Sequence, residues 1–94
     1  MSNVKSDPAA FIEYAAKNLV KNPNDVQVLP VKGSSALVIE LRVHPSDLGS
    51  IIGKNGRIAR ALRYLLSSIS VKVLQMDDGT SVKYSKILLE IIDD

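Results

Sequence analysis

Apolar side chains recur in pairs at every fourth position along the first part of the chain. This spacing places them in one stripe on a helix, and we expect that stripe to enter the core. Asp7-Pro8 is a typical helix start and Asn22-Pro23 a typical helix end, so the helix is predicted between them. The pairs that form the stripe are Phe11/Ile12, Ala15/Ala16 and Leu19/Val20.

The pattern then changes to short runs rich in β-branched residues. Residues 26–31 (VQVLPV) and 36–43 (ALVIELRV) flank the turn-prone residues 32–35 (KGSS), which predicts a β-hairpin. Every second residue from Leu37 to Val43 is apolar, and the residues between them include a glutamate and an arginine. This alternation predicts a sheet with one face covered by helices and one wetter face.

A short helix is predicted after the hairpin, from about Pro45 to Ile52, with Ser46 as its cap and Gly53 at its end. A longer helix follows residues 53–56, because apolar residues again recur three and four positions apart. The apolar residues of the short helix are Leu48, Ile51 and Ile52. Those of the longer helix are Ile58, Leu62, Leu65, Leu66 and Ile69.

The end of the longer helix is expected near Gln75, since Val73 and Met76 keep the helical phase. The same residues, 70–76 (SVKVLQM), also fit a strand that leads into a turn at residues 77–79 (DDG). The chain closes with residues 86–94 (KILLEIIDD), where the alternation of side chains predicts a buried final strand.

The predicted element order is therefore αββααβ. It defines an α+β fold in which helices cover one face of a three-stranded sheet. A length of 94 residues, with 46% hydrophobic and 23% charged residues, suits one globular domain over residues 1–94.

Composition excludes several kinds of site. There is no cysteine and only one histidine, His44, so disulfides, thiolate metal sites and histidine metal clusters are excluded, and no metal or cofactor is expected. The N-terminal residues lack the apolar core of a signal peptide, and the longest aliphatic run is far too short to span a bilayer. We therefore expect a cytoplasmic protein without a membrane segment.

Positive charge is concentrated in one part of the chain. The net charge is only +2, but residues 42–63 hold five basic residues and one acid, a local excess of +4. All four arginines of the protein lie in this window. A local basic surface attracts anions such as nucleic-acid phosphates, although a solvated helix face has the same composition.

The stretch GKNG, residues 53–56, lies in the middle of this basic window. Gly53 and Gly56 permit positive φ and carry no side chain that would hold a ligand away from the backbone. Lys54 adds charge, and free N–H groups of Arg57 and its neighbours at the following helix start favour phosphate. The simple alternative is a turn between two helices. That alternative explains neither the apolar residues before the loop nor the arginines after it.

Other chemistries fit the sequence less well. A phosphate-binding P-loop needs G-x-x-x-x-G-K followed by serine or threonine, but Gly49 lies one residue too near Gly53 and Asn55 replaces the hydroxyl. His44 precedes a proline at a strand end. Four of the acids form two adjacent pairs, at residues 77–78 and 93–94, where solvated charge is usual. No catalytic constellation is present, so we expect a protein that is not an enzyme.

The run IIGKNGRIARALR, residues 51–63, following a β-hairpin, resembles the core of a KH domain. Over nearly its full length the chain is similar to the small, single-domain bacterial KH proteins of the KhpA (YlqC) type. The resemblance implies single-stranded RNA binding, with about four nucleotides clamped by the G-x-x-G loop between two helices. It also implies a role as a post-transcriptional regulator or RNA chaperone. An RNA-recognition motif is disfavoured, because the predicted hairpin strands contain no aromatic residue.

Site residues follow from the resemblance at the positions that match. The loop would contact the sugar-phosphate backbone, and apolar side chains beside it would line a groove for bases. Two neighbouring arginines would meet phosphates, with Arg63 one turn further on. Val43 or Leu41 would add to the groove from the strand. The RNA-binding residues expected in this way are Gly53, Lys54, Asn55, Gly56, Arg57, Arg60, Ile51, Ile52 and Ile58.

The alternative function is a protein-interaction module, in which the KH-like fold dimerises and binds little RNA itself. Apolar residues spread around the longer helix, and a domain of this size gains stability through association. The resemblance implies a homodimer or a heterodimer with a larger KH protein of the KhpB (Jag/EloR) type. Residues 71–86 are longer than expected for such proteins, and could extend the helix, form a hairpin or contact another subunit.

Overall fold

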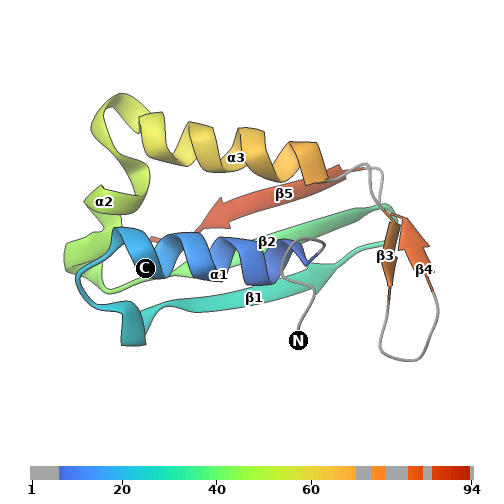
Figure 1. Cartoon of the computed structure of the whole chain (residues 1–94), viewed down its shortest axis with the longest axis horizontal. Coiled ribbons are helices and arrows are strands. Elements are labelled where there is room, and N and C mark those ends of the chain that lie inside the picture. The colour runs from blue at the N-terminus through green and yellow to red at the C-terminus, as the bar shows by residue number, and fades with distance from the viewer. Residues whose placement is uncertain (1–6, 70–72, 76–80, 84–85, 94) are drawn as a thin grey trace.

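The computed structural model describes residues 7–69, 73–75, 81–83 and 86–93, with side chains for residues 7–68 and 86–93. Helices and short 3₁₀ turns alternate with strands in the predicted order, with one additional pair of short strands (Figure 1). The elements are α1 (Pro8–Leu19), η2 (Pro23–Asp25), β1 (Gln27–Lys32), β2 (Ala36–Arg42), η3 (Pro45–Asp47), α2 (Leu48–Ile52), η4 (Lys54–Gly56), α3 (Arg57–Ile69), β3 (Val73–Gln75), β4 (Ser81–Lys83) and β5 (Lys86–Ile91).

The main sheet has the strand order β1-β2-β5. β1 pairs antiparallel with β2, as in the predicted hairpin, and β5 pairs parallel with β2. A parallel neighbour requires a crossover, which the chain makes through α2 and α3. Figure 1 shows α1 and α3 lying over the same face of this sheet. The fold is therefore the α+β, KH-like arrangement that the sequence predicts.

The core lies between the helices and the sheet, and it confirms the alternation predicted for the strands. Leu37, Ile39 and Leu41 of β2 are buried, and so are Ile87 and Leu89 of β5. The opposite side of β5 is open to solvent, so the final strand is buried on one face only. The helices contribute Ile12 and Ala16 from α1, Ile51 from α2, and Ala59, Leu62 and Leu66 from α3.

One leucine of the stripe predicted to enter the core is exposed. Leu19 is 39% exposed, so this assignment is wrong, whereas Leu65 on α3 is 47% exposed, in line with the apolar residues that spread around this helix. In α1 the buried positions are Pro8, Ile12 and Ala16, and other residues of the predicted stripe, Phe11, Ala15 and Val20, pack partly buried against the same core. In α3 the small residue Ala59 takes a buried position.

The expectation that α3 reaches Gln75 is also wrong. The helix ends at Ile69, and Val73–Gln75 forms the short strand β3, which pairs antiparallel with β4 (Ser81–Lys83). The β-branched Val73 suits a strand better than a helix, and this preference outweighs the helical phase of the segment. Of the structures predicted as alternatives for residues 71–86, the hairpin is the one observed. Its turn at residues 77–79 lies outside the described residues.

The start of α2 is attached to the end of α1 by one buried carboxylate. Asp47, only 1% exposed, accepts hydrogen bonds from the N–H groups of Lys21 (3.1 Å) and Asn22 (3.0 Å) and from Asn22 Nδ2 (2.9 Å). These bonds satisfy backbone donors beyond the end of α1 and fix the position of α2 relative to α1. The carboxylate therefore supports the loop that α2 leads into.

The hydrogen bonds also set the protonation of Asp47. Burial by itself raises the pKa of this carboxyl, but hydrogen bonds from the Asn22 side chain and from the backbone of Lys21 and Asn22, together with nearby His44, lower it below the usual value. Because folding lowers this pKa, the stabilisation is fully present above the unfolded pKa. It is lost as the pH falls through the folded pKa.

The expected cap at Ser46 is wrong. His44 Nδ1 accepts a hydrogen bond from the Ser46 N–H at 3.0 Å and so caps the 3₁₀ turn Pro45–Asp47, after which α2 spans only Leu48–Ile52. Proline occupies the first position of this turn, so the capping residue is the one before it. Among the described residues, no helix combines the length and apolar character needed to cross a membrane.

Candidate nucleic-acid interface

The loop between α2 and α3 has the backbone that its glycines allow. Gly53 (φ 77°) ends α2, with its N–H donating to Gly49 O at 2.8 Å. Gly56 also has positive φ (75°), and Asn55 between them has φ 57° and ψ 26°. Asparagine is one of the few residues that tolerate this left-handed region. The sequence GKNG therefore specifies a loop with three residues of positive φ within four positions.

The two glycines have different surroundings. A Cβ atom on Gly53 would overlap Ile58 Cγ1 and would lie 2.9 Å from both Ile58 Cβ and the Ile58 backbone N. A Cβ atom on Gly56 would meet nothing within 4 Å. The expectation that both glycines leave room for a ligand therefore holds at Gly56, whereas at Gly53 the first turn of α3 fills the corresponding space.

The N–H groups of the loop are also not equivalent. The Gly56 N–H donates to Gly53 O at 3.1 Å, and the Arg57 N–H donates to Lys54 O, so the expectation that Arg57 offers a free N–H is wrong. Within the described part of the chain, the N–H groups of Lys54 and Asn55 have no acceptor. Unpaired backbone donors next to a cation favour an anion. The available donors therefore lie two and three residues before Arg57, where one was predicted.

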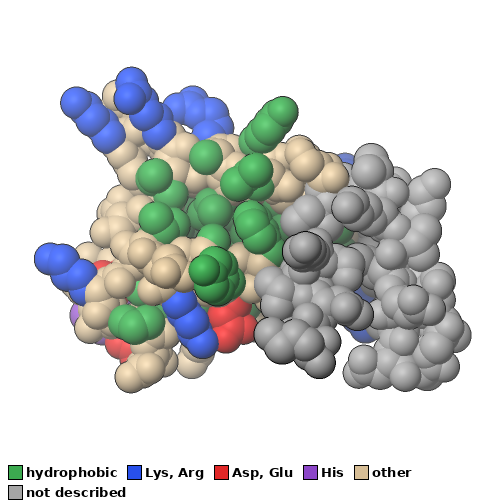
Figure 2. Space-filling view, viewed as in Figure 1, with side chains coloured by type: hydrophobic (Ala, Val, Ile, Leu, Met, Phe, Trp, Pro, Cys, Tyr) green, Lys and Arg blue, Asp and Glu red, His purple; other side chains and the backbone are tan. Residues whose placement is uncertain are grey.

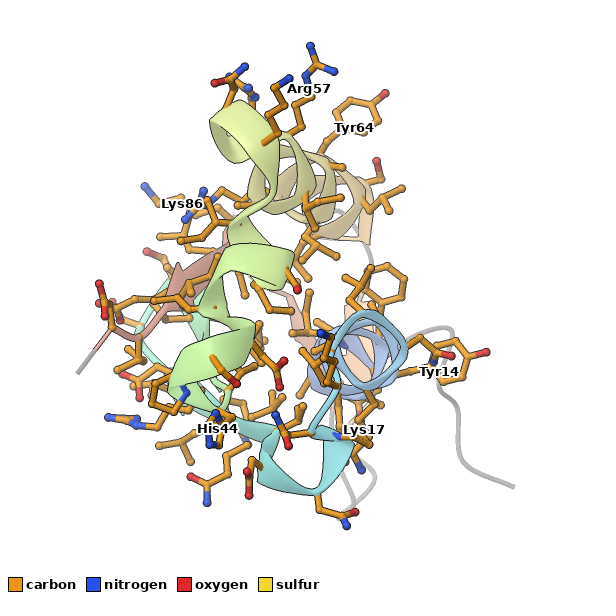
Figure 3. All side chains as sticks on the ribbon, turned by 90° about the vertical axis from the view of Figure 1, so that its left-hand side faces the viewer. Tyr14, Lys17, His44, Arg57, Tyr64 and Lys86 are labelled. Atoms are coloured by element: carbon orange, nitrogen blue, oxygen red, sulfur yellow. The ribbon has the colours of Figure 1, made fainter. Side chains whose placement is uncertain are left out.

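The basic side chains gather around this loop. Lys54, Arg57, Arg60 and Arg63 are all exposed, and residues 53–63 contain no acid. Figure 2 shows cations grouped at the end of the molecule where α2 turns into α3. Figure 3 shows Arg57 pointing away from the body of the protein at this end. The structure thus brings the predicted cations together on one surface.

Arg60 has a contact that the sequence does not reveal. Its Nη2 donates to the Asn55 carbonyl oxygen at 2.8 Å, across the loop. A charge-assisted hydrogen bond of this kind holds Asn55 in its left-handed conformation. Arg60 therefore positions the loop from within α3, in addition to carrying charge at its surface.

Only some of the apolar side chains predicted to line a groove for bases are exposed beside the loop. Ile51 is fully buried in the core, so the expectation that its side chain lines an open groove is wrong, and the same holds for Leu41. Ile52 is 39% exposed beside the loop, and Ile58 and Val43 are partly buried against the core. The structure therefore leaves Ile52 and Ile58 as the apolar side chains next to GKNG.

Sequence reasoning missed the two residues that hold α2 in place. Asp47 and His44 carry no motif, since their partners are recognised only once α1 and the 3₁₀ turn are positioned. The only local signal is the run HPSD, in which polar residues surround a proline ahead of an apolar helix. Such a run marks a helix start but does not name the residue that caps it.

The order αββααβ, the parallel closing strand and the G-x-x-G loop between two helices define a KH domain. The family described as "KhpA/KhpB, KH domain" matches residues 9–79, and the chain belongs to this family. No solved structure matches the chain.

Similar proteins include several that bear the name RNA-binding protein KhpA. The protein of Aquifex aeolicus (strain VF5) is 52% identical over 63 residues, which cover 67% of this chain and 80% of the relative. That of Streptomyces coelicolor is 46% identical over 66 residues, covering 70% and 84%. That of Clostridium perfringens is 38% identical over 82 residues, covering 87% and 96%.

Proposed function

We propose that this chain is a single KH domain over residues 1–94 that binds single-stranded RNA through the loop Gly53–Gly56. The observation that carries the proposal is the loop itself, with positive φ, open space at Gly56 and two unpaired N–H groups beside an acid-free cluster of cations. The relatives named RNA-binding protein KhpA support the same ligand. About four nucleotides fit such a loop and its flanking groove.

The role proposed for each residue follows from its position at the loop. Lys54 and Arg57 contact phosphates together with the N–H groups of Lys54 and Asn55, while Arg60 steadies the loop and adds charge. Ile52 and Ile58 offer apolar surface to bases. Binding involves no catalysis and no cofactor, and the setting is the cytoplasm, where a post-transcriptional regulator or RNA chaperone acts.

The salt dependence of RNA binding tests this function. Affinity of a fluorescent single-stranded octamer is measured at several salt concentrations for the wild type, for Lys54→Gln and for the matched control Lys32→Gln in the distant hairpin. We expect Lys54→Gln to weaken binding and to reduce the slope of log affinity against log salt by about 0.7, the share of one phosphate contact on a single strand. The control should behave as the wild type.

Amide spectra locate the contact in the same samples. The signals of residues 53–57 should shift as the octamer is added, because these N–H groups face the proposed phosphate site. An octamer that binds without moving these signals, with equal slopes for both variants, would place the RNA elsewhere and contradict the proposal.

The proposed pairing is a homodimer or a heterodimer with a larger KH protein of the KhpB type. Two exposed apolar side chains on α3, Tyr64 at 72% and Leu65 at 47%, support an interface on this helix. A KH-like module that only dimerises is not favoured, since the relatives are named for RNA binding. Sedimentation equilibrium should give twice the 10.2 kDa mass of the chain, and a strict monomer at high concentration would exclude the homodimer.

A further inference from the structure

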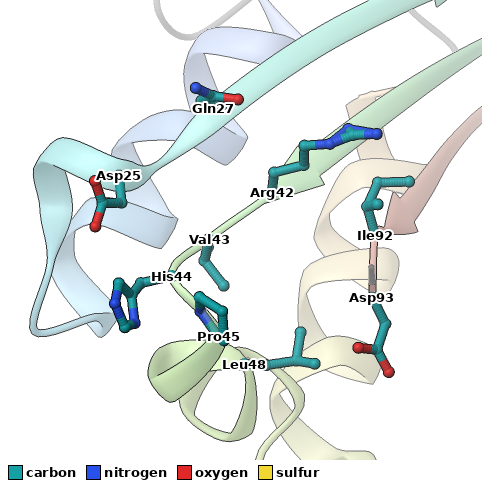
Figure 4. A pocket seen from close by; sticks show the side chains of 9 residues that line it. All are labelled: Asp25, Gln27, Arg42, Val43, His44, Pro45, Leu48, Ile92 and Asp93. Carbon is teal, nitrogen blue, oxygen red and sulfur yellow. The ribbon is translucent and has the colours of Figure 1, made fainter.

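A pocket opens at the end of the sheet, at the far end of α2 from the GKNG loop. It lies where β2 and β5 finish, on the side of the sheet that the helices leave open, and the residue after β2 leads from it into the 3₁₀ turn (Figure 4). We call it the end pocket. The residues that the argument uses are Arg42, Val43, Pro45, Leu48, Ile92 and Asp93.

The lining combines apolar walls with groups of opposite charge. Figure 4 shows Arg42 at the top of the pocket, Val43, Pro45 and Leu48 along one side, and Ile92 and Asp93 along the other. Asp25 adds a second carboxylate at the rim. A surface of this kind repels a phosphate from its acidic side, yet it suits a flat polar ring that presents both donors and acceptors. Among the parts of an RNA strand, that description fits a base and excludes the backbone.

The charges select among the bases. A carboxylate accepts hydrogen bonds, so Asp93 needs a base edge with donors, and guanine alone offers the adjacent N1–H and N2–H pair to both oxygens. Adenine and cytosine offer a carboxylate a single amino group, and uracil offers only its N3–H.

The end pocket is connected to the loop by α2. Leu48, which lines the pocket, and Ile52, which precedes Gly53, are four residues apart and therefore lie on the same side of this helix, about 6 Å apart along its axis. Figure 3 shows α2 between His44 at the pocket end and the loop end marked by Arg57. One strand can thus place phosphates at the loop and a base in the pocket.

We propose that the end pocket binds a guanine base of the single-stranded RNA held by the GKNG loop, with Asp93 accepting from N1–H and N2–H. This inference rests on the proposed function, since the loop must hold the strand first. It adds a sequence preference to a contact that otherwise reads only the backbone.

The test uses oligouridine octamers that carry one guanosine, inosine or adenosine at a central position. For the wild type we expect the guanosine octamer to bind about tenfold tighter than the adenosine octamer, with inosine between them because it lacks the N2 amino group. Asp93→Asn, an isosteric change near the chain end, should reduce the difference to less than twofold and leave the affinity for plain oligouridine unchanged. Glu90→Gln, on the open face of β5 outside the pocket, is the matched control and should keep the preference.

The outcomes separate the two proposals. Equal binding of the guanosine and adenosine octamers by the wild type, or an unchanged preference in Asp93→Asn, overturns the pocket inference while loop-dependent binding stands. Absence of binding to every octamer removes the proposed function and the inference with it. Guanosine monophosphate is added as a competitor, and displacement of the guanosine octamer at equal concentration would show that a free nucleotide, and not a strand, occupies the pocket.

Discussion

Replacing Lys54 and Asn55 together by aspartate is expected to abolish RNA binding at moderate salt. The change removes a cation and adds two anions beside the unpaired N–H groups, a shift of three charges at the proposed phosphate site. Loss of about 100-fold or more in affinity is expected, since each phosphate contact contributes strongly to binding. Fluorescence anisotropy with a labelled single-stranded octamer measures it.

The double change should leave the fold intact. Both glycines remain, and aspartate tolerates the left-handed conformation of Asn55 nearly as well as asparagine does. The matched control is Lys32→Asp with Ser34→Asp, which makes the same change in charge at the β1–β2 turn, at the opposite end of the molecule (Figure 1). If the loop variant binds within threefold of this control, the loop is not the RNA site.

Gly53→Ala is expected to destabilise the protein by about 3 kcal/mol, far more than Gly56→Ala. Both positions have positive φ, which costs an alanine roughly 1–2 kcal/mol. At Gly53 the new methyl group also overlaps Ile58, including its backbone N, and such overpacking costs a further 1–3 kcal/mol or so. At Gly56 the methyl group enters open space, so only the conformational cost of about 1 kcal/mol applies.

Thermal unfolding distinguishes the two glycines. The melting temperature of Gly53→Ala should fall by about 10 °C or more, and that of Gly56→Ala by a few degrees, given the size of the domain. Equal shifts for the two variants would mean that Ile58 does not pack against Gly53 as described. Gly56→Ala should instead show its larger effect in RNA binding, because the added side chain occupies the open side of the loop.

Much of the architecture is predictable because it rests on local periodicity. The alternation in β2 and β5 identifies Leu37, Ile39 and Leu89 as core residues, and the structure confirms each of them. The hairpin and the glycine-bounded loop are also predicted correctly from short stretches of sequence. All of these features depend on the order of residues that are close together in the chain.

The remaining features depend on how the elements are oriented against one another. Helical spacing groups Leu65 with Leu62 and Leu66, but the rotation of α3 about its axis turns Leu65 outward and buries Ala59. Ile51 and Ile52 are adjacent and chemically alike, yet one is buried and the other faces the loop surface. Residues 73–75 form a strand although their apolar spacing fits a helix, because they pair with residues 81–83.

The carboxylate of Asp47 joins groups separated by 25 and 26 positions in the chain. Its donors, at Lys21 and Asn22, are synthesised before the β1–β2 hairpin, whereas the acceptor follows it. The bonds that support the orientation of GKNG can therefore form only after the hairpin has been synthesised. A peptide containing only α2, the loop and α3 would have the same GKNG sequence but would lack Lys21 and Asn22, the hydrogen-bond partners of Asp47. We therefore expect affinity for nucleic acid to depend on the complete tertiary structure.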